Sequence, residues 1–154
     1  MSPAKNLCLS LALLTLPMLS FAESIATIKT LEGDVSVIRN GETLSAQLGA
    51  RVNELDRIIT SKSGSIGLLF DDDTRLGAGP NSALSLDNFA FDDRSNDGNL
   101  DVKVNSGSLA MIAGKLVEKR PGAVKVQTPT AILEVPDTEF AIKVANPLDK
   151  EIAE

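Results

Sequence analysis

Apolar and polar residues alternate in short runs along most of this chain, and this period of two is what most restricts its fold. In residues 66–70, Ile66, Leu68 and Phe70 fall on one face and Gly67 and Leu69 on the other, and in residues 139–144 Phe140, Ile142 and Val144 again occupy every second position. Successive side chains of a β-strand point to opposite faces of the sheet, so such runs are typical of strands with one buried face. Apolar patterns of helical spacing extend over no more than about two turns. The sequence therefore predicts an all-β fold with little helix.

Turn-forming residues divide these runs, with a Gly, Asn, Asp or Pro signal roughly every 8 to 12 residues, a spacing typical of all-β domains. The strongest signal is Asn40-Gly41, which lies between two apolar runs. Both central residues of a type I′ hairpin turn need positive φ, and Asn and Gly adopt it most readily. We therefore predict a hairpin at this dipeptide and about a dozen short strands in total.

Two alternating runs, residues 131–135 and 139–144, meet at Pro136-Asp137. Proline fixes φ at about −65° and cannot take a central position of a type I′ turn, so we expect a bent corner or a longer loop between these runs instead of a hairpin. Short strands joined by sharp corners suit either an irregular solenoid-like coil or a distorted sandwich. The sequence leaves both architectures open.

The first 22 residues have the pattern of a cleaved signal peptide. Lys5 provides the basic start, residues 7–16 form an apolar run, and Ser20-Phe21-Ala22 provides a small-x-small cleavage site. A retained membrane anchor is the alternative, but the apolar run is short against the roughly 20 residues that a spanning helix needs. We therefore predict export to the periplasm.

Cleavage after Ala22 would leave a β domain over residues 23–144 and a polar tail over residues 145–154. The single cysteine, Cys8, would be lost with the signal peptide, so the mature chain would have no disulfide. The chain has 15 basic and 21 acidic residues, and without Lys5 the formal net charge becomes −7, since 14 basic residues face 21 acidic ones. This charge argues against nucleic acid and anionic membrane surfaces as partners, because both attract basic proteins.

The residue types needed for common catalytic chemistry are missing. The chain contains no histidine, and no cysteine would remain after export, so a serine or threonine nucleophile would lack its usual base. A pair of carboxylates could still hydrolyse envelope glycans, and this alternative stays open. The mature chain has only four phenylalanines, and no Trp or Tyr, to stack on sugars. We therefore predict a protein that is not an enzyme and has no cofactor.

Two acidic segments are candidates for a cation site. Part of the spacing of an EF-hand loop is present in Asp93, Ser95, Asp97 and Asp101. The twelfth position is Val104, where calcium loops need an acid, so a polar loop is the preferred interpretation and a calcium-stabilised module the alternative.

The second acidic segment, residues 71–73, is three aspartates in a row and is predicted to be a turn.

Two further segments are candidates for recognition. Phe89 and Phe91 could form a small exposed patch, although core packing is preferred. Residues 115–120, which include three basic residues, could meet a polyanion or an acidic partner, but the segment is predicted to be a solvated, exposed loop that extends to residue 122.

The order and spacing of several short motifs between residues 33 and 144 resemble the FecR-type periplasmic domain. These motifs contain Gly33, Gly49, Asp56, Thr60, Phe70, Asp72, Thr128, Pro129, Thr138 and Phe140. We expect these signature residues to be structural. The chain departs from the family at Asp72-Asp73, where Asp-Gly is common, and at Pro136-Asp137, where Arg-Gly is common. Asp tolerates positive φ better than most residues, so both turns are expected to survive.

The resemblance implies an exported, non-enzymatic β domain that binds or scaffolds another cell-envelope protein, in envelope signalling. Some relatives are the periplasmic half of a membrane-spanning regulator that relays a signal from a TonB-dependent outer-membrane transporter to a cytoplasmic sigma factor. No cytoplasmic segment precedes the apolar run of this chain, which argues against direct control of a sigma factor. A strand edge or loop that allows sheet extension is the expected mode of binding.

Overall fold

The computed structural model describes residues 23–136 and 139–145, and these residues form twelve strands and one short helix. The strands are β1 (Ser24–Glu32), β2 (Val35–Arg39), β3 (Glu42–Ser45), β4 (Arg51–Asn53), β5 (Arg57–Thr60), β6 (Ser65–Phe70), β7 (Arg75–Ala78), β8 (Ala83–Asp92), β9 (Asp97–Ile112), β10 (Val124–Gln127), β11 (Ile132–Glu134) and β12 (Glu139–Val144), and the helix is α1 (Lys115–Lys119). The all-β prediction is confirmed. The predicted signal peptide, Thr138 and the predicted tail after its first residue lie outside the described residues.

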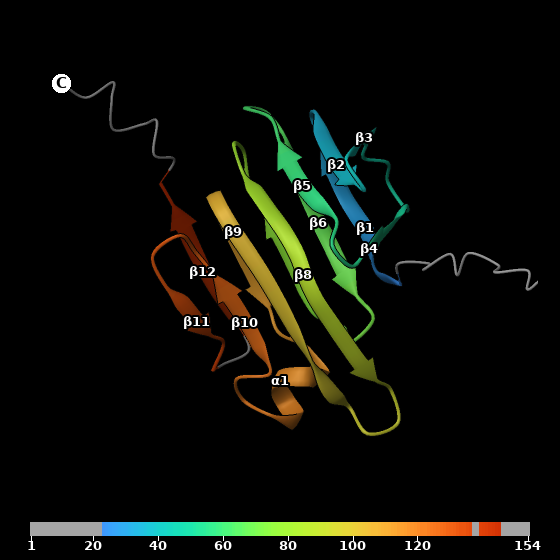
Figure 1. Ribbon diagram of the computed structural model, residues 1–154, viewed down its shortest axis with the longest axis vertical. Helices are drawn as coiled ribbons and strands as arrows, with labels where there is room; N and C mark the ends of the chain where they lie inside the picture. Colours follow the sequence, from blue (N-terminus) through green and yellow to red (C-terminus); the bar gives the residue numbers. More distant parts are fainter. Residues whose placement is uncertain (1–22, 137–138, 146–154) are drawn as a thin grey trace, which may run out of the picture.

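All twelve strands belong to one sheet that curls into a half-barrel with two layers (Figure 1). The front layer has the order β3-β2-β5-β8-β9-β10-β11, and the back layer has the order β4-β1-β6-β7-β9-β12. Only the β9–β10 pair is parallel among the described strands. Stacked coils of a solenoid pair in parallel, so the curled sheet is closer to the distorted sandwich.

Strand β9 belongs to both layers and joins them. Its first part, up to Ser106, pairs with β8 in the front layer, and residues from Gly107 onward pair with β7 and β12 in the back layer. Residues 105–107 look like a turn in the sequence, but the strand bends there without ending. Gly107 has φ +92°, and a Cβ at this position would collide with Ser82. The bend therefore needs glycine.

The core lies between the two layers and consists almost entirely of aliphatic side chains. The predicted alternation is confirmed in β6, where Ile66, Leu68 and Phe70 are buried while the residues between them are partly exposed. Full burial of such a side chain contributes about 1.5 to 3 kcal/mol. The ring of Phe70 lies 5.7 Å from that of Phe89, which is partly buried. Core packing is thus the role of Phe89, as preferred from the sequence.

The strand pairing agrees with two predictions about how neighbouring strands connect. Asn40 and Gly41 have φ +51° and +81° and connect β2 to β3, with Arg39 opposite Glu42. Asp137 of the Pro136-Asp137 corner lies outside the described residues, but the strands on either side do not pair with each other, because β11 pairs with β10 whereas β12 pairs with β9. The predicted absence of a hairpin between these two runs is confirmed.

The segment that follows β9 differs from its prediction. Residues 115–122 were expected to form an exposed loop, but Lys115–Lys119 form α1, and Leu116 and Val117 are buried. The adjacent apolar pair anchors the basic segment to the core, which a charge count alone does not reveal. Gly114 precedes the helix and lies so close to Asp72 and Thr74 that a Cβ would collide with their backbone.

Leu55 adopts a backbone conformation that strains a bulky residue. Its φ is +68° and its side chain is 69% exposed, in the turn where the Asp56 N–H donates to the Asn53 carbonyl. A left-handed conformation costs roughly 1 to 2 kcal/mol for a residue with a Cβ. We expect Leu55→Gly to stabilise the domain by about 0.5 to 1 kcal/mol in urea unfolding, after the entropy of glycine in the unfolded chain is subtracted.

Leu48→Gly is the matched control, because Leu48 is 67% exposed and is not among the residues with positive φ. That variant should be neutral or slightly less stable than the wild type. A loss of stability in Leu55→Gly larger than in the control would mean that the Leu55 side chain makes a stabilising contact that outweighs its strain.

Candidate functional site

A groove crosses the outer face of the back layer, perpendicular to its strands. Its floor is a row of small residues in register, in which Gly67 of β6 lies opposite Gly77 of β7, Gly77 opposite Ala110 of β9, and Ala110 opposite Ala141 of β12. The volume of the hollow around this row is about 590 Å³. We refer to it as the transverse groove.

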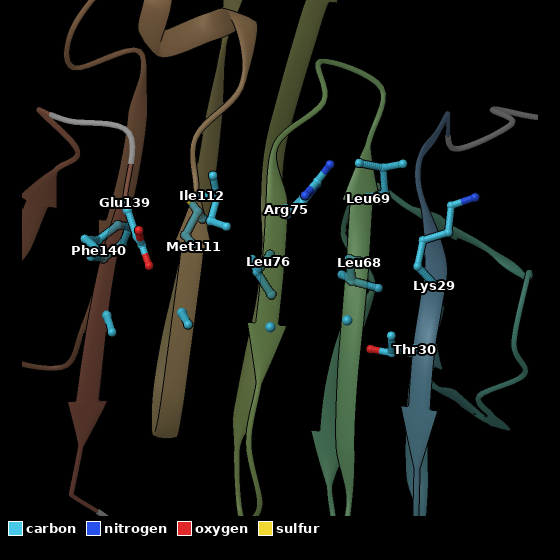
Figure 2. A pocket seen from close by; sticks show the side chains of 14 residues that line it. Lys29, Thr30, Leu68, Leu69, Arg75, Leu76, Met111, Ile112, Glu139 and Phe140 are labelled. Atoms are coloured by element: carbon cyan, nitrogen blue, oxygen red, sulfur yellow. The ribbon is translucent and has the colours of Figure 1, made fainter.

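On one side of the floor, larger residues two positions away along each strand form a wall (Figure 2). This wall consists of Leu69, Arg75, Ile112 and Glu139, which are in register with one another. On the other side of the floor, a second hollow of about 570 Å³ is lined by Ser65, Gly79, Ser108 and Lys143. Because Gly77, Ala110 and Ala141 line both hollows, the two form one continuous surface.

The groove ends at β1, where a bulge changes the pattern of exposure. The register with β6 shifts between Ile28 and Thr30, so Lys29 and Thr30 are both exposed on the outer face. A Cβ at Gly67 would collide with the Thr30 hydroxyl, whereas a Cβ at Gly77 would meet only the Ala110 carbonyl oxygen, 4.0 Å away. The floor is therefore tightly packed at Gly67 and open at Gly77.

Charged residues at the groove are mainly basic, although the whole chain has a net charge of −6. Lys29, Arg75 and Lys143 line the two hollows, and Glu139 is the only acidic lining residue. In the described part of the chain these four side chains form no ion pair. An apolar segment that carries an acidic group would match this surface.

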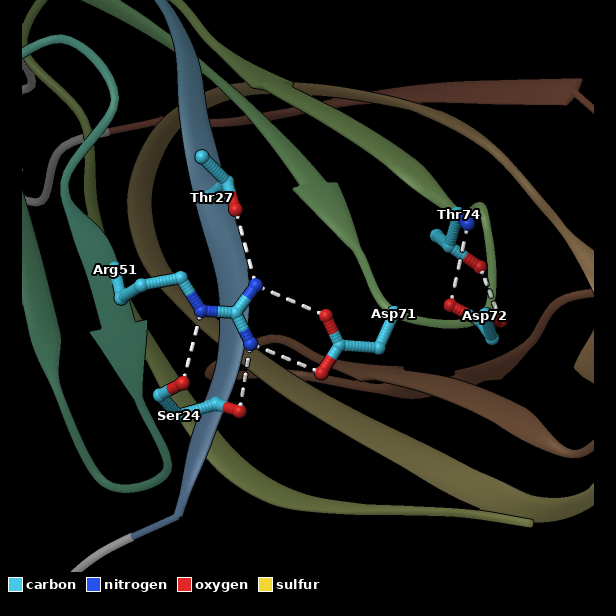
Figure 3. Close-up of polar contacts among 6 residues, drawn as sticks. All are labelled: Ser24, Thr27, Arg51, Asp71, Asp72 and Thr74. Atoms are coloured by element: carbon cyan, nitrogen blue, oxygen red, sulfur yellow. Dashed lines mark hydrogen bonds and ion pairs between the residues drawn. The ribbon is translucent and has the colours of Figure 1, made fainter. Parts of the chain in front are cut away.

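The three consecutive aspartates of the β6–β7 turn, residues 71–73, contact different partners. Asp71 accepts two hydrogen bonds from the Arg51 guanidinium, at 2.9 and 3.0 Å, and Arg51 also donates to Ser24 and Thr27 (Figure 3). The hydrogen bond to Asp71 raises the pKa of Arg51 above its ordinary value. This exposed network fixes the start of β1 to the β6–β7 turn.

Asp72 is buried and organises the turn from within. Its carboxylate accepts hydrogen bonds from the Thr74 N–H at 3.1 Å and the Thr74 hydroxyl at 2.6 Å, and that hydroxyl accepts one from the Gly114 N–H. Asp73 has φ +67° in the position where the family commonly has Gly, so the predicted survival of this turn is confirmed. The Lys115 ammonium lies 2.7 Å from Asp73, which raises the pKa of Lys115.

Two other signature residues also form buried polar contacts. Asp56 accepts two hydrogen bonds from the Arg39 guanidinium, at 2.9 and 2.7 Å, and the hydrogen bonding raises the pKa of Arg39. The Thr60 hydroxyl donates to the Gly79 carbonyl at 2.7 Å and accepts from the Ser82 N–H at 2.8 Å. Both residues tie neighbouring segments together and leave no free group for chemistry.

The remaining signature residues lie in turns, in the core and at the sheet edge. Gly33 and Gly49 have positive φ in the β1–β2 and β3–β4 connections. Thr128 and Pro129 begin the β10–β11 hairpin, where the Thr128 hydroxyl accepts from the Ala131 N–H at 3.0 Å. Phe140 is only partly buried, because β12 is the last strand of the back layer.

The structure does not bring the four candidate calcium ligands together. The β8–β9 hairpin closes with Asp92 opposite Asp97, and Asp101 lies further along β9 beside Asn88. The Arg120 guanidinium lies 3.9 Å from the Asp97 carboxylate, and a fixed cation there opposes a second one. Among the described residues no group of three or more acidic, histidine or cysteine side chains is suitably placed for a metal.

The groove was not predicted from the sequence. Gly67 and Gly77 occupy outward positions of alternating runs, which looks like ordinary weakening of a strand. Only the register between β6, β7, β9 and β12 aligns them with Ala110 and Ala141, and single-strand patterns contain no information on register.

A comparison with protein-family models gives a match to the FecR protein model over residues 56–152, well over half of the chain. The chain belongs to the FecR family. FecR domains are typical of envelope signalling regulators, are commonly periplasmic and are generally non-catalytic. The match covers β5 to β12 and the transverse groove except for its β1 end, while Gly33 and Gly49 precede it.

The other comparisons gave no match, either among curated proteins or among solved structures. In the part of the FecR chain that the structure describes, no helix has the length and hydropathy needed to span a membrane.

Proposed function

We propose that this FecR protein is an exported, non-enzymatic module of an envelope signalling system that binds an apolar, acid-bearing segment of another envelope protein in the transverse groove. In this proposal the signal peptide is cleaved after Ala22, and residues 23–144 act in the periplasm as the folded domain, followed by the polar tail. The family assignment supports the general role, and the groove supports the binding mode.

The observation that carries the proposal is an open, apolar groove on the face of a sheet, with basic residues along it. Leu69 and Ile112 are the apolar members of one wall, Ile112 is 46% exposed, and exposed apolar surface gathered in a groove often marks an interaction site. Lys29 and Arg75 lie on the same side of the floor and would attract a carboxylate of the bound segment.

The alternative of a glycan hydrolase has no such support. Two carboxylates must face one substrate in that chemistry, and Glu139 is the only acid that lines the groove. Buried Asp56 and Asp72 are occupied by hydrogen bonds with their own chain.

Filling the groove floor tests the proposal. Gly77→Leu adds a side chain into open space on the strand, whereas Ala90→Leu adds the same side chain at an exposed position of β8 in the other layer. In cross-linked pull-downs from envelope extract, we expect one protein to be captured by the wild type and by Ala90→Leu, and its yield to fall at least about tenfold with Gly77→Leu.

A defined probe gives a second measurement on purified protein. The dye 1-anilinonaphthalene-8-sulfonate is apolar and anionic, so its fluorescence should rise with the wild type and with Ala90→Leu and should be largely lost with Gly77→Leu and Arg75→Glu. Equal capture and equal dye fluorescence for all variants would contradict binding in the groove. Circular dichroism would establish that each variant is folded.

A further inference from the structure

Strand β12 is the last strand of the back layer and presents an edge. It pairs with β9 on one side, and no described strand pairs with its other side. It has six residues, whereas the other edge strands, β3, β4 and β11, have four, three and three. An edge of this length displays a row of backbone N–H and C=O groups that can pair with another strand.

The sequence of β12 is complementary to itself. In an antiparallel pair of two copies centred on Ala141, Glu139 lies opposite Lys143 and Phe140 lies opposite Ile142. Directly opposite side chains share one face of a sheet, so the two ion pairs form on the outer face and the two apolar pairs on the core side. Within one copy Glu139 and Lys143 are about 13 Å apart along the strand and cannot pair.

Antiparallel pairings of two β12 strands with a different centre do not place Glu139 opposite Lys143. Moving the centre by half a residue places outer residues opposite core-side residues. Moving it to Phe140 or Ile142 keeps the faces but removes the opposition of acid and base. Of the four described edge strands, β12 alone carries charges of both signs, since β3, β4 and β11 each have a single charged residue.

We propose that two copies of this chain form a symmetric dimer by antiparallel pairing of their β12 strands, centred on Ala141. The pairing covers Phe140, Ile142 and Val144, which are only half-buried in one copy. It also aligns the two groove floors, because Ala141 is the last residue of the row that starts at Gly67. The dimer goes beyond the proposed function and does not depend on it.

Charge reversal tests the pairing directly. Sedimentation of the purified mature protein should give a concentration-dependent dimer, and Glu139→Lys or Lys143→Glu should each raise its dissociation constant roughly tenfold or more, because two attractive pairs become repulsive. The double variant Glu139→Lys with Lys143→Glu restores opposite charges and should recover the dimer. Lys119→Glu changes the same charge on the exposed side of α1 and should have no effect.

A cysteine at the centre gives a second measurement that does not depend on charge. Ala141→Cys would place two thiols opposite each other, so mild oxidation should cross-link the dimer, and Ala90→Cys, exposed on β8, should not. A wild type that stays monomeric in concentrated solution, or a double variant as weak as the single ones, would overturn the proposal. Both measurements use no other protein, so failure of the partner-binding proposal leaves them unaffected.

Discussion

Replacing Gly107 with alanine is expected to destabilise the domain by about 3 to 4 kcal/mol. Gly107 has φ +92°, and the added Cβ would collide with the Oγ, Cα and Cβ of Ser82. The positive φ contributes roughly 1 to 2 kcal/mol of strain and the overpacking about 1 to 3 kcal/mol. The Ser82 backbone cannot move away freely, because its carbonyl accepts the Thr60 N–H and its own N–H donates to Thr60.

The measurement is urea unfolding followed by circular dichroism. Gly77→Ala is the matched control, because it also replaces a strand glycine but adds its Cβ to open space, so no loss of stability is expected. A loss below 1 kcal/mol in Gly107→Ala would mean that the bend of β9 relaxes easily and that the two layers do not depend on it.

Strand existence could be predicted from the sequence, but strand length and pairing could not. The alternation of Ile66, Leu68 and Phe70 identifies β6 because burial of one face decides which residues are apolar. The 16-residue strand β9 looks like two strands with a turn, because Asn105-Ser106-Gly107 has turn chemistry. Its pairing with β8 and then with β7 stabilises an extended backbone there despite the local turn preference. Such pairing joins residues that are far apart in the sequence, so the pattern within one short segment does not predict it.

The candidate site could be predicted only in part for the same reason, because strand pairing could not be predicted from the sequence. The signature residues were identified from the order and spacing of their motifs, and the described ones lie in turns, in the core, in buried hydrogen bonds or, in the case of Phe140, at the sheet edge. The groove instead depends on which strands lie side by side. Gly77 forms part of the groove floor only because Gly67 and Ala110 lie opposite it on the neighbouring strands. A binding surface of this kind requires the structure.

Removal of the Asp72 carboxylate is expected to cause the second-largest loss of stability, after Gly107→Ala. Asp72→Ala leaves the Thr74 N–H and hydroxyl without their acceptor in a site where both residues are fully buried. A buried polar group left unsatisfied costs about 1 to 3 kcal/mol, so we expect a loss of about 3 kcal/mol for the two groups together. The damage should extend to α1, because the Thr74 hydroxyl accepts the Gly114 N–H at the start of the helix.

Asp71→Ala provides the control within the same turn. Asp71 and Arg51 are exposed, with side-chain exposures of 44% and 41%, and the removal of an exposed ion pair typically costs less than about 1 kcal/mol. The loss in free energy of unfolding, measured in urea, should therefore be larger for Asp72→Ala than for Asp71→Ala by about 2 kcal/mol or more. Equal losses in the two variants would mean that water replaces the Asp72 carboxylate, and that the β6–β7 turn and α1 are held together by apolar contacts instead.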